Sequence, residues 1–427
     1  MTSPFIARFH ALFDRLAALL HLDRPLSQPL ALPSPHRPSP DIDPEHCLDI
    51  PVCDHGPGLR MHDDLFARGQ FLARQENWDD LARTIAAAEA ARECTPSGMP
   101  AADLLALGAR SDVVLGAEHA LLDGRPSRDA PLGAGIRALE GVLREYPDSY
   151  PVALIVALAH IDIGWAWRGA GWDATVPRAN RSAFQRHFDR AQEILAPYCG
   201  LELNSPAVAA ARCALLAGDP EAQARVADDY EDLIDLAPLN HRHMRALGIH
   251  MLPRWFGGYD QLELEARRTA ARTQDVWGAG AYAWVYLDAV AMDEEACARV
   301  DLDFFLDGIQ DIVAARPDQP MINLLTAYCA VTLQQRLGYD STADFARTRI
   351  GDCARWLIRD HLTEVHPLVW AHAAEGADVA ARITSSNRFA ARGRSDALQA
   401  ISDSFAEDIL RGNRVRFTAE GPKLMPL

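Results

Sequence analysis

The chain has 427 residues, of which 49% are hydrophobic and 24% charged, proportions typical of a folded protein with a sizeable core. This length allows two or three globular domains or one long helical solenoid. The net charge of -17 argues against a nucleic-acid partner, because binding to the phosphate backbone requires a basic surface.

Lysine is almost missing from the chain. Among the 42 lysines and arginines, Lys423 is the only lysine, and it lies close to the C-terminus. A P-loop needs a lysine that reaches the phosphates, and a Schiff-base enzyme needs an internal lysine. Both chemistries are therefore disfavoured.

The eight cysteines are scattered, and none forms a CxxC pair, which argues against zinc-ribbon and thioredoxin-like sites. Most of them lie in apolar helical stretches, where a thiol packs as a small hydrophobic side chain. We therefore expect a reducing, cytoplasmic location and no cofactor. No stretch is apolar and long enough to predict a membrane span.

The N-terminal segment 1–23 contains apolar side chains at helical spacing over residues 4–21, which predicts an amphipathic helix. Asp14 and Arg15 interrupt its apolar run and argue against a signal peptide. Three arrangements remain open: the helix folds back on the body, docks a partner, or lies on a membrane surface. Residues 24–58 are rich in proline and predict an extended, semi-rigid linker.

Residues 59–410 predict one helical-repeat domain, because alanine and leucine dominate and β-branched alternation is scarce. Ser205-Pro206 and Asp219-Pro220 each place an N-cap residue before a proline suited to the first helical position. They predict a helical hairpin of residues 206–217 and 220–236. The tail, 411–427, is expected to be either a strand-like cap or a free peptide.

Proline also marks the expected helix ends, at Tyr146-Pro147, Ala196-Pro197, Ala237-Pro238 and Arg316-Pro317, with a further break at Trp277-Gly278. The spacing is roughly 40 to 50 residues, or twice that, which is typical of stacked helix pairs. Residues 169–177 are interpreted as an insertion. We therefore expect an all-α fold of stacked helical hairpins that form a right-handed solenoid.

The segment 237–268 reads as helix, aromatic-rich glycine turn, helix, and its turn is Pro253-Arg254-Trp255-Phe256-Gly257-Gly258-Tyr259. The junctions Leu143–Gly164, Leu233–Tyr259 and Ile312–Gly338 resemble the tetratricopeptide repeat. The turn, together with Leu65-Phe66 and Asn77-Trp78-Asp79-Asp80-Leu81, also resembles an uncharacterised bacterial family that has a Pro-Arg-Trp-x-Gly-x-Tyr turn. Phe256 departs from the glycine expected there. The resemblance implies a tetratricopeptide-like helical-repeat fold and no particular activity.

Tryptophan is concentrated in glycine-containing turns between residues 165 and 284. Equivalent turns of stacked repeats line up along one edge, so these turns predict an aromatic binding surface with arginines as donors. The predicted binding residues are Trp165, Trp167, Arg168, Trp172, Arg254, Trp255, Tyr259 and Trp277, joined by His243 and His250. The alternative is that the tryptophans fill gaps between helix pairs and the arginines bond to helix C-terminal carbonyls.

Histidines and carboxylates suggest a different kind of site. No HExxH motif is present, so neither the histidines of 241–250 nor His366 and His372 predict a local metal site, which leaves open only a site assembled from several helices. Two sets of carboxylates lie at helical spacing, and both are more typical of a solvated surface than of a metal or acid–base site. The first runs along one expected helix and comprises Asp228, Asp229, Glu231, Asp232 and Asp235. The second comprises Asp303, Asp307 and Asp311, which share one helical face. An enzyme, or a small-molecule or metal binder, would need a pocket inside the superhelix; its polar residues would be His160, Asp162, His243, His250, Arg254 and Tyr259.

The sequence as a whole favours a bacterial cytoplasmic scaffold that binds a protein or a peptide, although a fold does not by itself define a function. The acidic balance favours a basic partner. No catalytic residue, metal or cofactor is expected. The arrangement of the six polar residues named above distinguishes the scaffold from the pocket, because a pocket requires them to converge.

Overall fold

The computed structural model describes residues 43–53, 57–122, 125–127, 132–169, 175–338, 341–375 and 386–426. Their contacts divide the chain into two compact units, with the division at residues 54/55 and 265/266. We call residues 55–265 the middle unit, and residues up to 54 together with those from 266 the terminal unit. This division falls within the helix Tyr259–Arg272.

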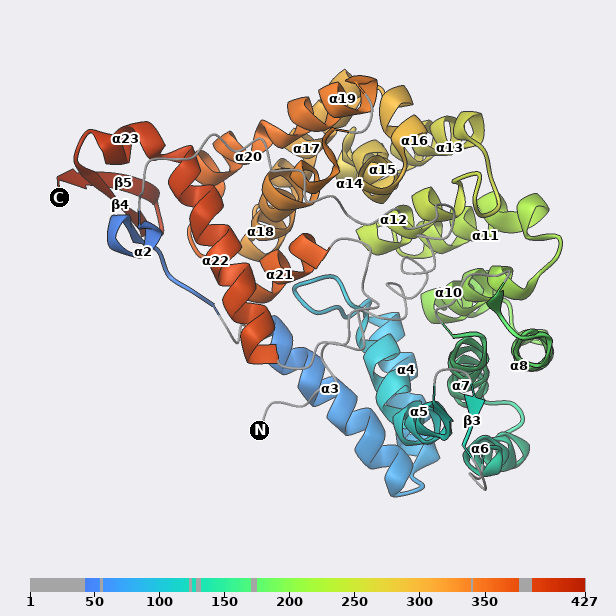
Figure 1. Cartoon of the computed structure of the whole chain (residues 1–427). Coiled ribbons are helices and arrows are strands. Elements are labelled where there is room, and N and C mark those ends of the chain that lie inside the picture. Colours follow the sequence, from blue (N-terminus) through green and yellow to red (C-terminus); the bar gives the residue numbers. More distant parts are fainter. Residues whose placement is uncertain are drawn as a thin grey trace. The chain divides into compact units, whose positions relative to one another are not determined.

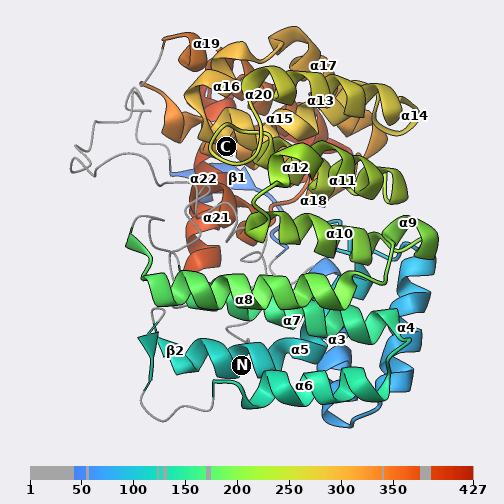
Figure 2. The ribbon, with the colours of Figure 1, turned by 90° about the vertical axis from the view of Figure 1, so that its right-hand side faces the viewer.

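Where the structure describes the middle unit, its secondary structure is helical apart from two short strands, β2 (Leu121–Leu122) and β3 (Arg125–Pro126), which pair antiparallel. Its helices are α3 (Pro57–Arg74), α4 (Trp78–Ala90), α5 (Ala101–Ala120), α6 (Ala134–Glu145), α7 (Tyr150–Arg168), α8 (Arg178–Leu195), α9 (Gly200–Leu203), α10 (Pro206–Leu215), η2 (Leu216–Gly218), α11 (Ala222–Leu236), α12 (His241–His250) and the first half of α13 (Tyr259–Arg272). Within this unit, α5, α7 and α8 lie side by side (Figure 2).

Helix α7 forms the apolar centre of the middle unit. It is long and apolar enough to cross a membrane, but 78% of its most apolar window is buried within the fold. Its buried residues run almost without a break from Pro151 to Trp165, because it packs against α5, α6, α8 and α10. Packing inside the helical layers therefore accounts for the hydropathy of α7.

The terminal unit combines helices from the second half of the chain with a short segment that precedes the middle unit. The elements are α2 (Pro44–Cys47), β1 (Leu48–Asp49), α14 (Gln274–Trp277), α15 (Gly280–Met292), α16 (Glu294–Arg299), α17 (Leu302–Ala315), α18 (Gln319–Ala327), η3 (Tyr328–Thr332), η4 (Gln334–Arg336), α19 (Ser341–Gly351), α20 (Cys353–Trp356), η5 (Leu357–His361), α21 (Pro367–Glu375), α22 (Ser386–Ser404), α23 (Ala406–Leu410), β4 (Asn413–Thr418) and β5 (Gly421–Pro426).

The all-α class expected from the sequence is confirmed for the described residues. The helix ends expected before proline are also confirmed: α6, α8, α11 and α17 end at Glu145, Leu195, Leu236 and Ala315. Each end lies one residue before the X-Pro dipeptide. The ring of proline disfavours the helical conformation of the residue before it, which explains the ends of α6, α11 and α17. At the end of α8, Ala196 keeps helical backbone angles, so this steric effect does not account for that end.

The predicted hairpin of α10 and α11 is present, with one correction to its second helix. Ser205 caps α10 as expected, since its side chain accepts a hydrogen bond from the Val208 amide. Helix α11 begins at Ala222 rather than at residue 220. Asp219 instead accepts a hydrogen bond from the Glu221 amide at 2.8 Å, so Asp219 and Pro220 form a turn that precedes the helix.

The tail of the chain forms an antiparallel hairpin of β4 and β5, and β1 pairs parallel with β4. Figure 1 shows α2 beside this hairpin, although the two are far apart in sequence. Residues 43–53, expected within the extended linker, thus contain a helix turn and a strand. The Leu48 side chain is only 6% exposed, so this segment packs on the fold, which its proline-rich composition did not predict.

Several expected features lie outside the described residues. They are the helix over residues 4–21, the linker over 24–42 and 54–56, and Trp172 with the centre of the insertion at 169–177.

Candidate functional site

The aromatic turn at the end of α7 packs inward. Trp165 is 8% exposed, and its ring meets Phe184 and Phe188 of α8 edge-on at 5.0 and 5.8 Å between centroids. The Arg168 guanidinium lies 5.8 Å from the centre of the Trp165 ring, and Trp167 is half-buried. This turn therefore offers a partner only part of its aromatic surface.

The turn between α12 and α13 also packs on its own unit. Trp255, which is half-buried, lies 5.6 Å from the His250 ring and 5.7 Å from the Phe256 ring. Arg254 and Tyr259 are half-buried as well. At Gly257 a Cβ atom would lie 2.4 Å from the Met251 carbonyl oxygen, so the tightness of this turn requires glycine there.

Trp277 is in the core of the terminal unit, where its side chain is 1% exposed and meets Trp284 edge-on at 6.0 Å. The predicted aromatic residues are thus distributed over both units. Two of them, Trp165 and Trp277, fill space between helices, which is the alternative that the sequence had left open. They leave a partner little surface to contact.

The three histidines expected to line a pocket have separate partners. His160 lies 2.9 Å from His187, His243 lies 3.0 Å from the Asn240 side-chain amide, and the His250 ring lies 2.7 Å from the Tyr230 hydroxyl. Burial lowers the pKa of His243 to about 3 and that of His250 to about 4. These histidines are therefore neutral packing groups near pH 7, and their polar contacts do not converge.

The sequence pointed to Asp162 as a pocket residue but not to the charge cluster that it forms with Arg110 and the half-buried Asp103 in the middle unit. Arg110 on α5 and Asp162 on α7 form an ion pair of 2.7 Å, and both side chains are below 5% exposed. Burial, and then the charge of Glu89, raise the pKa of Asp103 to about 6. Asp103 and Arg110 are seven residues apart on one face of α5, a spacing that could have indicated the cluster. Because Arg110 is held by Asp162, this cluster is a structural centre of the unit.

The outer face of α11 is an exposed acidic surface. Asp228, Glu231, Asp232 and Asp235 are exposed and spaced three or four residues apart, whereas Val226, Tyr230 and Leu233 are buried on the opposite face. Burial and the neighbouring Asp232 raise the pKa of Asp235, so carboxylates on this face repel one another. The sequence predicted this carboxylate run, and the structure places it on the surface.

Exposed leucines lie on α9 and directly after α11. Leu201 and Leu203 of α9 are 49% and 37% exposed, and Leu239, which follows α11, is 66% exposed. Arg92 joins the two elements, because its guanidinium donates to the carbonyl of Leu236 at 3.0 Å and to the side chain of Asn204 at 2.5 Å. We call the exposed carboxylates of α11 together with Leu201, Leu203 and Leu239 the acidic–leucine surface.

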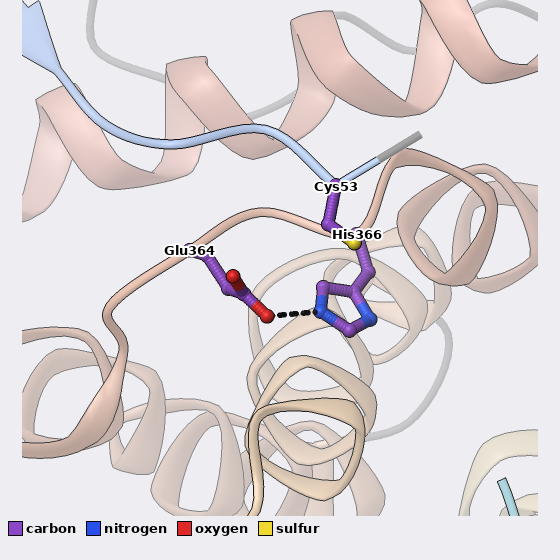
Figure 3. Close-up of side chains that lie close together, drawn as sticks. All are labelled: Cys53, Glu364 and His366. Atoms are coloured by element: carbon purple, nitrogen blue, oxygen red, sulfur yellow. Dashed lines mark hydrogen bonds and ion pairs between the residues drawn. The ribbon is translucent and has the colours of Figure 1, made fainter. Parts of the chain in front are cut away.

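The terminal unit contains one group of described residues whose side chains are suited to hold a metal. The Sγ atom of Cys53, a carboxylate oxygen of Glu364 and a ring nitrogen of His366 lie within 4.8 Å of one another (Figure 3). Cys53 is more than 300 residues from the other two in sequence, so no local motif signals this group.

Comparison with protein-family models, curated proteins and solved structures finds no match to this chain.

Proposed function

We propose that this chain is a bacterial, cytoplasmic helical-repeat scaffold that binds a basic segment of a protein partner on the acidic–leucine surface. The observation that carries the proposal is the exposure of four carboxylates and three leucines around the α9–α11 junction. In this proposal the helical hairpins stack in the right-handed manner of tetratricopeptide repeats, and the surface lies on the outside of one such hairpin.

The chemistry of the surface defines the partner. A row of carboxylates attracts arginine or lysine side chains and raises the rate of encounter, an effect that salt screens. Leucines that become buried on binding contribute about 1.5–3 kcal/mol each if they are fully covered. The partner is therefore a basic amphipathic segment whose apolar side chains cover the leucines while its cations face α11.

The electrostatics of α11 support a cationic partner. The pKa of Asp235 is raised because burial and the charge of Asp232 disfavour its ionised form. A cation bound beside these carboxylates would relieve this repulsion.

In the same proposal, the half-buried aromatic and arginine residues expected at the edge make secondary contacts with the partner. Trp167, Arg168, Arg254, Trp255 and Tyr259 keep part of their surface accessible, and all lie in the middle unit. His160, His243 and His250 have separate partners and do not converge on one site. They therefore give no support to the alternative of an enzyme or a small-molecule binder.

The experiment that tests the proposal is quantitative affinity capture from native cell extract, followed by titration of the captured partner with purified protein. The variant combines Asp228→Lys, Asp232→Lys and Leu239→Ser. The matched control combines Asp63→Lys, Asp64→Lys and Phe71→Ser on α3, where all three residues are exposed. We expect the α11 variant to lose at least tenfold in affinity for the partner and the α3 control to keep its affinity. Binding of the partner to the wild type should weaken as the salt concentration rises.

Equal losses in both triple variants would contradict a local surface, and a partner retained at full affinity by the α11 variant would overturn the proposal. The pair Arg254→Glu and Trp255→Ala tests the secondary contacts in the same assay. Circular dichroism of every variant establishes that the helical fold is kept.

A further inference from the structure

We propose that Cys53, Glu364 and His366 form a binding site for a divalent transition-metal ion, with Zn²⁺ as the expected ion. The three donor atoms lie within 4.8 Å of one another. Zinc binds thiolate sulfur at about 2.3 Å and imidazole nitrogen at about 2.0 Å, so donors around a shared ion lie only roughly 3–4 Å apart. Small side-chain rotations are enough to bring the three onto one ion.

A backbone contact places Cys53 beside the other two donors. The Cys53 amide donates to the Val365 carbonyl at 2.8 Å, and the Val365 amide donates to the Pro51 carbonyl at 2.9 Å. These bonds form a parallel bridge between Val52 and Val365. Alternate side chains point to opposite faces of such a bridge, and Val365 is completely buried while Glu364 and His366 flank it.

The loop that carries Glu364 and His366 is fixed by Asn323, which is completely buried on α18. The Oδ1 atom of Asn323 accepts from the His366 amide and from Nε1 of Trp370, both at 2.9 Å. Its Nδ2 atom donates to the Glu364 carbonyl at 3.0 Å. A single side chain therefore sets the backbone of both donor residues.

A second side chain on the same helix holds the start of the loop. The Oε1 atom of Gln319 accepts from the Thr363 amide at 2.9 Å, and its Nε2 atom donates to the His361 carbonyl at 2.8 Å. Metal sites depend on outer residues that orient the donors before the ion arrives. Gln319 and Asn323 meet this requirement through the backbone of the loop.

The donor set distinguishes the site from an ordinary surface ion pair. Glu364 and His366 are 2.9 Å apart, which alone is common between exposed side chains. The added thiol gives sulfur, nitrogen and oxygen donors, a combination that suits Zn²⁺ and disfavours Mg²⁺ and Ca²⁺, which prefer oxygen. The Glu364 side chain is 36% exposed and that of His366 is 16% exposed, so the site is accessible to an ion from solvent.

A bound ion would attach the segment that carries Cys53 to the loop before α21, and so strengthen the terminal unit. All three donors must be deprotonated to bind, so metal affinity is expected to fall as the pH is lowered. This site is independent of the proposed partner surface, because its residues belong to the other unit.

The test is titration of the metal-free, full-length chain with Co²⁺, followed by competition with Zn²⁺. Cobalt bound to a thiolate gives a sulfur-to-metal charge-transfer absorption, which identifies the cysteine directly. The site variants are Cys53→Ser, Glu364→Gln and His366→Gln. The matched controls are Cys47→Ser on α2 and His361→Gln, since His361 contributes only its backbone carbonyl to this loop.

We expect one equivalent of Co²⁺, displaced by Zn²⁺, in the wild type and in both controls. Cys53→Ser should lose the charge-transfer absorption, and the other two site variants should bind at least tenfold more weakly. Absence of that absorption in the wild type, or its full retention in Cys53→Ser, would overturn the proposal. If Cys53→Ser fails to fold, the Glu364→Gln variant decides the test, because this substitution keeps the backbone contacts of the loop. An unchanged affinity of Glu364→Gln for Co²⁺ would then refute the site.

Discussion

The guanidinium of Arg110 and the carboxylate of Asp162 form a 2.7 Å ion pair in which both side chains are almost completely removed from solvent. The pair joins α5 to α7 across the centre of the middle unit. Breaking a buried pair leaves one uncompensated charge, whereas replacing both partners with apolar residues removes the desolvation cost of both.

We therefore predict that Asp162→Asn lowers the free energy of unfolding by about 3–5 kcal/mol. The double variant Arg110→Met, Asp162→Leu should recover most of this loss. Urea denaturation of the single and double variants measures both effects. A single variant within about 1 kcal/mol of wild type would contradict the assignment, since a buried charge without its partner costs more than that.

Glu89 and Ser205 stabilise the start of α10 together. The Oε1 atom of Glu89 accepts from the Ser205 hydroxyl at 2.6 Å and from the Ala207 amide at 2.9 Å. A buried hydrogen bond to a charged group is worth about 1.5–3 kcal/mol, so Glu89→Ala should destabilise by at least this amount. The control is Glu93→Ala at an exposed position close by.

In a double-mutant cycle, Glu89→Ala and Ser205→Ala should show coupling of about 1 kcal/mol or more, because the two side chains share one hydrogen-bond network. Additive effects of the two substitutions would contradict the cooperative capping of α10.

His250 should make the middle unit sensitive to acid. Burial lowers its pKa from 6.5 to about 4, so the unfolded state binds a proton more readily than the folded state between these values. The stability that neutral His250 contributes is complete above about pH 6.5 and is lost as the pH falls towards 4. The full contribution is about 3 kcal/mol.

The variant His250→Gln should accordingly show a smaller loss of stability between pH 7 and pH 4.5 than the wild type. Chemical denaturation at the two pH values measures the difference, and His119→Gln, at an exposed position, is the control. If the wild type and His250→Gln lose the same stability over this range, the prediction is wrong.

Asp103 should have the opposite effect on pH dependence. Burial, and next the charge of Glu89, raise the pKa of Asp103 from 3.8 to about 6, so the folded state favours the protonated carboxyl. The ionised form then costs the fold roughly 2–3 kcal/mol, a cost that appears as the pH rises from about 4 to 6. We predict that Asp103→Asn stabilises the chain at pH 7 and changes little at pH 4.

Thermal and urea denaturation of the wild type and Asp103→Asn at these two pH values measure the difference in stability. A variant that is less stable than the wild type at pH 7 would mean that attraction to Arg110 and Arg242 outweighs the cost of burying the charge.

The sequence alone determined the helical class and the places where helices end. Prolines restrict the residue directly before them, so the ends of α6, α11 and α17 follow from a local steric rule. The cap of α10 by Ser205 is equally local. The carboxylate run of α11 was also visible, because a helical face has a fixed period.

Only the tertiary structure decided which of these residues face solvent and which distant residues meet. Tryptophan suits both a core and an interface, so the burial of Trp165 and Trp277 depends on which helices pack over them. The contact between Cys53 and the Glu364–His366 loop depends on a bridge between segments more than 300 residues apart. Sequence periodicity describes the faces of single elements, whereas these sites are made where faces of different elements come together.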